Sequence, residues 1–459
     1  MPVDAAFDIL VVGAGGCGLT AAIAAKALQP DIQVAVLEKA DRLMGNTMLS
    51  SGSIPAANTR FQRAAGVQDN PEIMMEDLFG VSGAHEATDI TRQLAFISAE
   101  LIEWLVDVAH VEMTLVETYK HIGHRVHRLH SPPSRKGADL MHDLHKTAQA
   151  MEIPIVYDNA VTQLLVSSDG AVAGVMAQTP DDVVTSLGAR SVILATNGFG
   201  ANRDLLTQFC PEISKAPYAG SPGSQGEAII WGMQLGAAVA NMGAYQAHAS
   251  LADPHGSLVT WTVIEKGGII VDAQGRRFGN ETMGYSAFAE VELAHQGPFY
   301  MISDRNIRDV TASGQPEYAE LCANGGVIQA EDVQALAKRL AMNESALSAT
   351  ITQAMACART GQPDPFGRVS WGLGPLQAPL CVTRITPAMF HTQGGLRVDE
   401  HAHVLRHDGS QIKGLYAGGG AAAGISGFKG AAGYVSGNGL LTALGLGYLA
   451  GRSSARELS

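Results

Sequence analysis

Cysteine is scarce in this sequence, and the five cysteines are widely spaced: Cys17, Cys210, Cys322, Cys357 and Cys381. No two form a C-x-x-C pair, which argues against a redox-active disulfide, and no C-x-x-C-H segment for haem attachment occurs. An odd number of dispersed thiols is typical of a reducing compartment. We therefore expect a cytoplasmic protein whose thiols lie mostly in the core.

Positive charge and long apolar runs are also lacking. Lys and Arg number 31 against 44 Asp and Glu, so the formal net charge is -13. Nucleic acids and anionic membrane surfaces bind basic patches, so we expect no nucleic-acid partner. No run of about 18 apolar residues is present, and residues 1–7 do not resemble a signal peptide, so we expect no membrane partner.

Glycine is abundant instead, with 52 residues in a chain of 459, which is long enough for two domains. Hydrophobic periodicity predicts a strand over residues 7–12, a helix over 19–28 and a second strand over 33–37, a β-α-β opening with a parallel sheet. Further helices are predicted over 90–108, 138–151, 330–342, 345–359 and 438–450. Further strands are predicted over 161–166, 171–176, 192–196 and 415–417.

The composition changes at about residue 244 and returns to its first style after residue 390. We predict an α/β protein with a Rossmann-like nucleotide-binding domain formed by residues 1–243 and 391–459. An inserted α+β capping domain, residues 244–390, would bind the substrate.

A glycine-rich loop joins the first predicted strand to the first helix. Gly13, Gly15 and Gly18 have the G-x-G-x-x-G spacing, and Glu38 ends the second strand. In this motif the glycines permit a tight turn, close approach of a pyrophosphate and close helix packing, while the acidic residue accepts hydrogen bonds from ribose. A glycine-rich turn without a ligand is the alternative.

Further segments resemble the flavoprotein family of fumarate reductase, succinate dehydrogenase and 3-ketosteroid dehydrogenase, over nearly the whole chain. They are Glu38-Lys39, Gly45-Asn46-Thr47, Ser50-Ser51-Gly52-Ser53, Ala195-Thr196-Asn197-Gly198-Phe199, Leu415-Tyr416-Ala417-Gly418-Gly419 and Ser436-Gly437-Asn438-Gly439-Leu440. The resemblance implies an FAD-binding domain with the FAD pyrophosphate at the first helix. It implies FAD contacts at Gly13, Gly15, Gly16, Gly18, Glu38, Lys39, Asn46, Thr47, Ser51, Gly52, Val161, Ala195, Thr196, Asn197, Gly198, Gly419, Ser436, Asn438, Gly439 and Leu440.

One departure concerns how the flavin is held. Family members with covalent FAD carry a histidine immediately before a Thr in the segment after the second strand, whereas this chain has Asn46 before Thr47. An amide does not form that bond, so non-covalent FAD is implied. No second glycine fingerprint for NAD is present, so we expect an external electron donor or acceptor.

The substrate residues are also implied by the resemblance. The segment 246–250 resembles the family's Q-x-H-P-T, in which His248 holds a substrate carboxylate, and Thr260 falls at a second ligand of that carboxylate. Segment 275–281 resembles G-K-R-F-x-N-E, which implies Arg277 as the proton donor. Because the pKa of arginine is above 12, this role needs relayed protons, and a structural ion pair is the alternative for Arg277.

Departures from the fumarate reductase pattern predict a different substrate. Phe390 stands at a substrate histidine, with His391 one place later, Tyr434 at a substrate arginine, and Trp261 at the proton-relay glutamate. We expect at most one carboxylate, near His248, and a carbonyl, ring or alkyl part near Tyr434. A shift of one residue would return the imidazole of His391 to the second carboxylate site.

The ketosteroid dehydrogenases resemble this chain at two tyrosines. Tyr434 matches their carbonyl-binding Tyr, and segment 280–285 resembles N-E-x-x-P-Y, whose Tyr, here Tyr285, is the catalytic base, with Gly284 in place of Pro. Ordinary core tyrosines are the alternative. Six histidines between residues 121 and 145 form no known metal pattern, so we expect no metal site.

Together these features predict an FAD-dependent oxidoreductase that transfers a hydride between flavin N5 and a C–C bond α,β to a carbonyl or carboxylate of a small molecule. The alternatives are a ketosteroid-type dehydrogenase, a flavin oxidase that uses oxygen, and a flavin-binding protein without catalytic activity.

Overall fold

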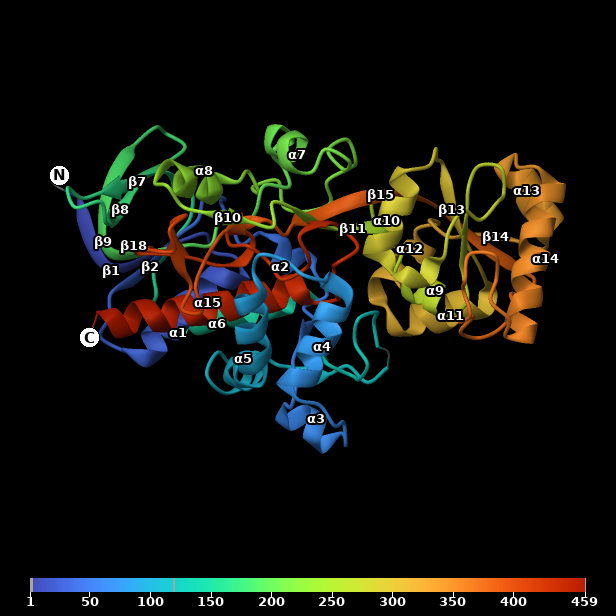
Figure 1. Ribbon diagram of the computed structural model, residues 1–459, viewed down its shortest axis with the longest axis horizontal. Helices are drawn as coiled ribbons and strands as arrows, with labels where there is room; N and C mark the ends of the chain where they lie inside the picture. Colours follow the sequence, from blue (N-terminus) through green and yellow to red (C-terminus); the bar gives the residue numbers. More distant parts are fainter. Residues whose placement is uncertain (1–2, 119, 459) are drawn as a thin grey trace. The chain divides into compact units, whose positions relative to one another are not determined.

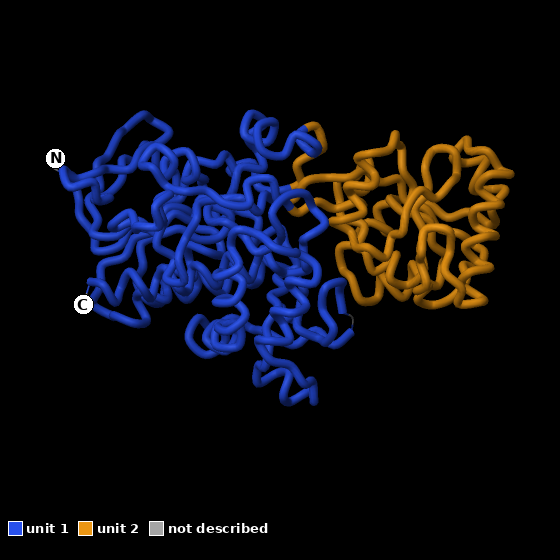
Figure 2. Tube along the Cα trace, viewed as in Figure 1, with its two compact units in different colours: residues 1–214, 220–245, 391–459 blue, residues 215–219, 246–390 orange. Residues whose placement is uncertain are grey.

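The computed structural model describes residues 3–118 and 120–458, which form two compact units (Figure 2). Unit 1 contains residues 1–214, 220–245 and 391–459, and unit 2 contains residues 215–219 and 246–390. The short segment 215–219 of unit 2 has no counterpart in the sequence prediction.

Unit 1 is built on an eight-stranded sheet (Figure 1). Its main path is β17 (His403–Leu405), β18 (Gln411–Ala417), β9 (Val184–Leu194), β1 (Ala5–Val12), β2 (Val34–Leu37) and β6 (Ile155–Val156). Strands β18, β9, β1, β2 and β6 run parallel to one another. Strand β17 is antiparallel to β18. β7 (Ala160–Val166) and β8 (Val172–Gln178) extend β9 as an antiparallel pair. The predicted Rossmann-like α/β fold is confirmed.

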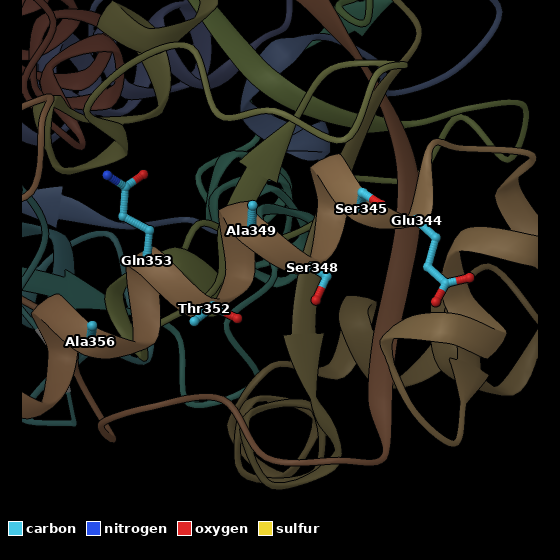
Figure 3. A pocket seen from close by; sticks show the side chains of 7 residues that line it. All are labelled: Glu344, Ser345, Ser348, Ala349, Thr352, Gln353 and Ala356. Atoms are coloured by element: carbon cyan, nitrogen blue, oxygen red, sulfur yellow. The ribbon is translucent and has the colours of Figure 1, made fainter.

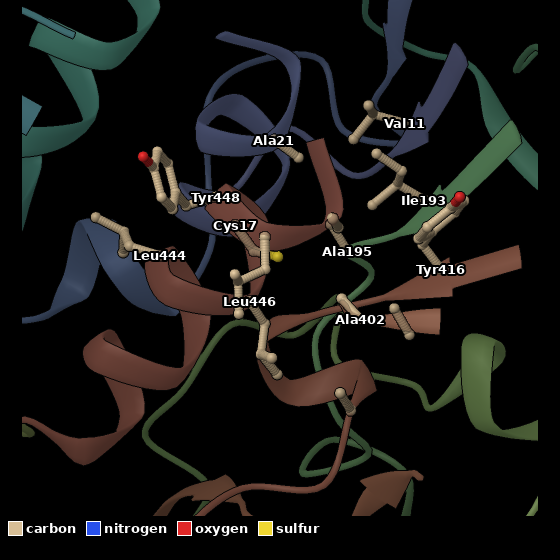
Figure 4. Packing of buried hydrophobic residues seen from close by; sticks show 14 of the residues in the cluster. Val11, Cys17, Ala21, Ile193, Ala195, Ala402, Tyr416, Leu444, Leu446 and Tyr448 are labelled. Atoms are coloured by element: carbon tan, nitrogen blue, oxygen red, sulfur yellow. The ribbon is translucent and has the colours of Figure 1, made fainter. Parts of the chain in front are cut away.

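The core of unit 1 brings the two ends of the chain together. Helix α1 (Gly16–Leu28) packs along α15 (Asn438–Glu457), and Figure 4 shows side chains from both helices beside those of the central strands. Glycines allow the close approach: a Cβ on Gly447 would lie 2.4 Å from Cys17 O, and one on Gly451 would lie 2.1 Å from Ala21 O. Larger residues at these positions would push the helices apart.

The other elements of unit 1 are short strands and helices. The helices are α2 (Asn46–Leu49), α3 (Arg60–Ala64), α4 (Pro71–Ser82), α5 (Thr88–Asp107), α6 (Gly137–Ala150), α7 (Arg203–Phe209) and α8 (Glu227–Gln234). β3 (Ile54–Pro55), β5 (Leu129–Ser131) and β4 (Thr114–Leu115) form one small sheet, and β10 (Val239–Ala240) and β16 (Gly395–Leu396) form another.

Unit 2 is an α+β structure. β12 (Ile269–Val271), β13 (Phe299–Asp304), β14 (Ile328–Ala330) and β15 (Leu380–Thr392) form antiparallel pairs. β15 continues into unit 1, as does β11 (Gly243–Ala252), which pairs there with β19 (Lys429–Gly430). The helices are α9 (Thr262–Glu265), α10 (Tyr285–Leu293), α11 (Arg305–Gly314), α12 (Pro316–Ala323), α13 (Val333–Leu340) and α14 (Glu344–Thr360).

The predicted helices and strands are found, with shifted ends. Helix α13 begins later than predicted because Asp332 caps it, its Oδ1 accepting from Ala335 N at 2.8 Å, and because β14 occupies the preceding residues. Helix α15 runs beyond the predicted residue 450, to Glu457. In the described part of the chain, no helix combines the length and the apolar character needed to cross a membrane.

His403 ties the end of α15 to the edge of the sheet. Its Nδ1 lies 3.0 Å from Asp399 Oδ2, and its Nε2 lies 2.6 Å from Glu457 Oε1. The Tyr416 hydroxyl donates to Glu457 Oε2 at 2.7 Å. Burial would lower the pKa of His403, but its hydrogen bonds and ion pairs with both carboxylates outweigh burial and raise it.

Replacing His403 with Gln is expected to lower the free energy of unfolding by about 1.5–3 kcal/mol near pH 5.5, because hydrogen bonds to charged groups are lost. A raised folded-state pKa gives stabilisation that is complete below the unfolded value of about 6.5 and is lost as pH rises through the folded value. The difference in free energy of unfolding between wild type and variant, measured with urea, should therefore be smaller at about pH 9 than near pH 5.5. The exposed neighbour His401, replaced by Gln, is the control, and an equal difference at both pH values would contradict the prediction.

Candidate functional site

The predicted FAD segments gather at one edge of the large sheet. Strands β18, β9, β1 and β2 are adjacent and parallel, so their carboxyl ends lie together. Each is followed by a predicted FAD segment, and the segments are hydrogen-bonded to neighbouring strands. Gly13 N donates to Leu37 O at 2.8 Å, and Ala195 N donates to Val12 O at 2.9 Å. Dinucleotides bind at this edge in doubly wound sheets.

The glycine loop has the geometry that a pyrophosphate requires. Gly13 has a φ of +106°, and a Cβ on it would lie 2.5 Å from Ala195 O. A Cβ on Gly18 would lie 1.9 Å from Gly13 O, whereas one on Gly15 would meet no atom within 4 Å. Gly15 therefore borders open space at the N-terminus of α1, which has no side-chain cap. N–H groups at such a helix end bind phosphate.

Acidic and basic residues follow β2. The carboxylate of Glu38 accepts from Ala14 N at 2.8 Å and from Ala40 N at 2.9 Å, which fixes it beside the glycine loop. Lys39 Nζ donates to Gly223 O at 2.6 Å and pairs with Glu227. Glu38 is therefore oriented for ribose, while Lys39 is engaged within the protein.

Asn46, where the resemblance implied a histidine in proteins with covalent FAD, is hydrogen-bonded within the protein. Its Oδ1 accepts from Ser221 N at 2.7 Å. Thr47 packs against the glycine loop, where a Cβ on Gly16 would lie 2.7 Å from Thr47 Oγ1. Gly52 has a φ of +69°, and Ser51 Oγ lies 3.0 Å from Ser53 Oγ.

Two buried polar atoms in the predicted FAD segments support binding of a ligand by these segments. Thr196 Oγ1 and Asn438 Oδ1 are buried and have no hydrogen-bond partner among the described residues. Beside them, Asn197 Nδ2 donates to Ser224 Oγ at 2.8 Å. Buried polar groups are nearly always hydrogen-bonded, so these atoms, with the open space at Gly15, fit a polar cofactor such as FAD.

The remaining predicted FAD contacts lie in unit 1. Val161 follows the start of β7, close behind Asn159, whose N donates to Glu38 O at 2.9 Å. A Cβ on Gly198 would lie 2.0 Å from Thr392 Oγ1, and one on Gly419 would lie 3.2 Å from Cys17 Cβ. Ser436 O lies 2.9 Å from His124 Nε2, and Gly439 and Leu440 lie in the first turn of α15.

Tyr434 and His391 come together in unit 1. Their rings are 5.6 Å apart and edge to face, and a Cβ on Gly439 would lie 2.9 Å from His391 Nε2. Burial raises the pKa of Tyr434 to about 12, against the opposing effect of hydrogen bonds from Gly439 and Gly437. Burial lowers the pKa of His391 to about 4. Both side chains are therefore neutral at pH 7.

His248 and Tyr285 form a stacked pair in unit 2. Their ring centroids are 4.5 Å apart with an interplanar angle of 13°. Trp261 and Phe390 complete the group, at 6.0 Å and 5.7 Å from the His248 ring. We call these four side chains the aromatic cluster. A hydrogen bond of 3.1 Å from Ala247 N to Ser286 Oγ joins β11 to α10 beside the stacked pair.

The structure also explains two departures from the family patterns. Gly284 precedes Tyr285 with a φ of +104°, which proline cannot adopt because its ring holds φ near -65°. Phe390 contacts His248, whereas the next residue, His391, contacts Tyr434, as the alternation of side chains along a strand requires. No shift of one residue replaces Phe390 with the imidazole.

His248 is held as a neutral imidazole. Ser250 N donates to its Nδ1 at 3.2 Å, so Nδ1 is an acceptor and carries no proton. Ser250 Oγ also donates to Val259 O at 2.7 Å, which fixes the hydroxyl. The proton of the ring is thus on Nε2. Thr260, the other predicted ligand of the substrate, lies nearby in sequence, with its Oγ1 3.2 Å from Thr262 Oγ1.

Arg277 belongs to a different group of side chains. Its Nε donates to Glu281 Oε1 at 2.8 Å, and its Nη1 pairs with Asp364. The guanidinium lies 5.3 Å from the Phe366 ring and 5.4 Å from the Trp371 ring. Burial lowers the pKa of Arg277, but its bonds and charges with the two carboxylates outweigh burial and raise it. A more basic guanidinium does not release a proton at neutral pH.

The sequence did not reveal the partners of Arg277. Asp364 lies 87 residues away along the chain, and Arg368, which also pairs with Glu281 at 3.2 Å, lies in the same loop. The Glu281 carboxylate also accepts from Ile270 N at 3.1 Å, and Asn280 Oδ1 accepts from Thr282 N at 3.0 Å. Asn280 and Glu281 thus stabilise the segment before Tyr285 through these hydrogen bonds.

Replacing Arg277 with Gln is expected to destabilise unit 2 by about 3–5 kcal/mol, because the buried Asp364 would lose its ion pair and Glu281 would keep only its pair with Arg368. Both carboxylates are fully buried. Urea unfolding monitored by fluorescence would measure the loss. The neighbouring Arg276, whose side chain is 64% exposed, gives the control variant Arg276→Gln. A variant as stable as wild type would contradict the structural role.

The six histidines between residues 121 and 145 lie in unit 1 and serve different contacts. His130 Nε2 lies 2.8 Å from Thr59 Oγ1, and His145 Nε2 lies 3.2 Å from Tyr157 Oη. Burial lowers the pKa of His124 to about 4. Across the described residues, no three His, Cys, Asp or Glu side chains are grouped to hold a metal ion.

Two surface grooves lie apart from the predicted site residues. One, of about 640 Å³, runs along α14 and is shown in Figure 3; it is lined by Glu344, Ser345, Ser348, Ala349, Thr352, Gln353 and Ala356. The other, of about 370 Å³, lies beside His145 and Tyr157. Apart from Glu344, the side chains that line the first groove are small or uncharged, and none of them is a predicted site residue.

Known proteins resemble this chain over nearly its whole length. Two proteins are each 28% identical to this chain over 98% of its length: NADH:fumarate oxidoreductase of Klebsiella pneumoniae (strain 342) and the probable fumarate reductase Ifc3 of Shewanella frigidimarina (strain NCIMB 400). The chain spans 48% of the first protein, about half its length, and 75% of the second.

Solved structures show the same fold. The open conformation of a flavocytochrome c3 fumarate reductase has a TM-score of 0.83 and 26% identity, covering 99% of this chain and 79% of that one. A 3-ketosteroid-Δ4-(5α)-dehydrogenase from Rhodococcus jostii RHA1 has a TM-score of 0.77 and 26% identity, covering 99% and 98%. Residues 8–436 match the family model described as FAD binding domain. The chain therefore belongs to this FAD-binding family, whose cofactor is FAD.

Proposed function

We propose that this protein is an FAD-dependent oxidoreductase that acts on a C–C bond next to a carbonyl or carboxylate of a small molecule. FAD supplies the hydride at N5 when bound. Unit 1 contains the dinucleotide edge, and unit 2 contains the stacked pair of His248 and Tyr285. The observation that carries the proposal is the stacked pair of His248 and Tyr285, in a chain that belongs to an FAD-binding family.

Tyr285 is the proton-transferring group of this proposal. In the reductive direction, a hydride adds to the β-carbon of the substrate, the C=C electron pair moves to the α-carbon, and the phenol donates a proton there. Tyr285 is partly exposed, which leaves it accessible, and its ring stacks on an imidazole. The buried ion pairs of Arg277 support assigning the proton to Tyr285 instead of Arg277.

The names of similar proteins include both a reductase and a dehydrogenase, which are the two directions of such a reaction. One is called urocanate reductase, from Eggerthella lenta, and is 27% identical over 90% of this chain. The ketosteroid dehydrogenase structure contains 4-androstene-3,17-dione. Tyr434, neutral and hydrogen-bonded by two backbone N–H groups, favours a ketone over a carboxylate. Dehydrogenation next to a ketone is therefore the second candidate.

Reoxidation of reduced FAD tests the proposal. Protein photoreduced without oxygen is mixed with cyclohex-2-enone, acrylate, urocanate or fumarate, and the return of oxidised-flavin absorbance is followed. We expect fast reoxidation by at least one unsaturated carbonyl compound. Failure of all compounds in both directions would refute the proposal, and fast reoxidation by oxygen alone, with peroxide formed, would identify an oxidase. The physiological electron partner would be external.

We also propose that FAD is bound without a covalent bond. Asn46 stands where covalent attachment would need a histidine, and its Oδ1 already accepts from Ser221 N. Acid precipitation of the yellow protein should release all flavin as free FAD into the supernatant, where its absorbance is measured. Flavin that stays with the washed, denatured protein would contradict this prediction.

A further inference from the structure

Trp261 has a buried hydrogen-bond donor that the protein does not use. The side chain is 2% exposed, and its Nε1 is buried without a hydrogen-bond partner in the described part of the chain. An indole nitrogen is a donor only, so it must meet an acceptor to recover the hydration it has lost. Buried donors without partners are rare in folded proteins, because each one is costly.

The position of Trp261 distinguishes it from an ordinary core residue. Its ring lies 6.0 Å from His248 and 6.4 Å from Tyr285, the two residues assigned to the substrate. A second tryptophan, Trp371, is also buried with an unpartnered Nε1, but it lies over Arg368 at 4.2 Å, in the ion-pair group. Of these two tryptophans, Trp261 is the one whose ring lies in the aromatic cluster.

The donors of the aromatic cluster are uncharged. His248 is the neutral tautomer with its proton on Nε2, since Ser250 N donates to Nδ1. Tyr285 and Trp261 contribute a phenol and an indole. The nearest cation in the sequence motifs, Arg277, is paired with Glu281 and Asp364. A buried carboxylate needs a charged partner, whereas the two lone pairs of a carbonyl oxygen are satisfied by neutral N–H groups.

We propose that Trp261 is a specificity-determining residue, whose Nε1–H donates to an uncharged carbonyl oxygen of the substrate and so selects a ketone or aldehyde over a carboxylate. This inference rests on the proposed function. When a hydride adds to the β-carbon, negative charge develops on that oxygen. Donors from Trp261 and His248 stabilise the charge, and Tyr285 then protonates the α-carbon. The residue that replaces the relay glutamate of fumarate reductases would thus change the substrate from a dicarboxylate to an enone.

A matched pair of probes tests this inference: cyclohex-2-enone and cyclohex-1-ene-1-carboxylate, which share a six-membered ring. Binding to the oxidised protein is measured from the change in FAD absorbance, and reduction is measured with the photoreduced protein. Wild type should bind and reduce the enone in preference to the carboxylate. Trp261→Phe, which removes the donor and keeps an aromatic ring, should raise the Kd of the enone roughly 3- to 10-fold with little effect on the carboxylate.

Controls separate hydrogen bonding from packing. Trp371→Phe loses a similarly buried indole outside the aromatic cluster. It should leave the ratio of the Kd values of the two probes unchanged. Trp261→His, which restores a ring N–H, should recover part of the preference. An unchanged probe ratio in FAD-loaded Trp261→Phe, or a wild type that prefers the carboxylate, would overturn the inference while leaving the proposed function intact. Selective binding of the enone without reduction of either probe would support the inference and count against the proposed function.

Discussion

Replacing Tyr285 with Phe will lower turnover by roughly 10²- to 10⁴-fold, the usual effect of removing a positioned acid or base. The substitution deletes only the hydroxyl, so the ring keeps its stacking on His248, which is 4.5 Å away between centroids. FAD content should therefore equal that of wild type, and the loss should appear in kcat. Stopped-flow reoxidation of the photoreduced protein by the best unsaturated substrate is the measurement.

A second tyrosine in unit 2 provides the matched control for Tyr285. Tyr300 lies on β13, where it pairs with Arg384 across the sheet, outside the aromatic cluster. Tyr300→Phe should therefore react at the wild-type rate. If Tyr285→Phe reacts at the wild-type rate as well, the proton comes from another group. The pH profile would add evidence, because loss of a titrating phenol should remove one limb of the wild-type profile.

Replacing Gly15 with Val will abolish FAD binding while leaving the protein folded. A Cβ on Gly15 would meet no protein atom within 4 Å, so the added side chain enters the open space at the start of α1. A pyrophosphate bound by the free N–H groups of this helix needs that space. The ratio of flavin to protein absorbance should fall from near one FAD per chain to almost none, and circular dichroism should be unchanged.

Other glycines define the controls for this substitution. A Cβ on Gly80, in α4, would also meet no atom within 4 Å, so Gly80→Val should keep its FAD. Gly18→Val should fail to fold, because its Cβ would lie 1.9 Å from Gly13 O. Full flavin occupancy in Gly15→Val would show that the loop does not hold the pyrophosphate.

The FAD edge of unit 1 was predictable because its signals are local. The fingerprint from Gly13 to Gly18 spans the turn after β1 and the first residues of α1, and Glu38 comes directly after β2. Gly18 has its reason within this short segment, because a Cβ there would lie 1.9 Å from Gly13 O. The parallel order of the strands then follows from the β-α-β connection.

The partners of Arg277 were not predictable in the same way. Its motif places it before the N-E pair, and the resemblance implied a proton donor. The buried partner Asp364 is 87 residues distant, in a loop without regular periodicity. Long-range pairing of charges depends on which segments the fold of unit 2 brings together. A local sequence pattern therefore does not predict which residues pair.

The sequence by itself determined the Rossmann-like fold and the FAD-binding family, and it named the candidate residues for the substrate. Strand and helix periods, turn glycines and motif spacing act over a few residues, so the chain carries them in readable form. The tertiary structure decided which of those residues meet. It stacks Tyr285 on His248, buries the indole of Trp261 beside them and encloses Arg277 between carboxylates. These outcomes depend on packing between distant segments, because proton transfer, charge pairing and hydrogen bonding are decided by distances in space.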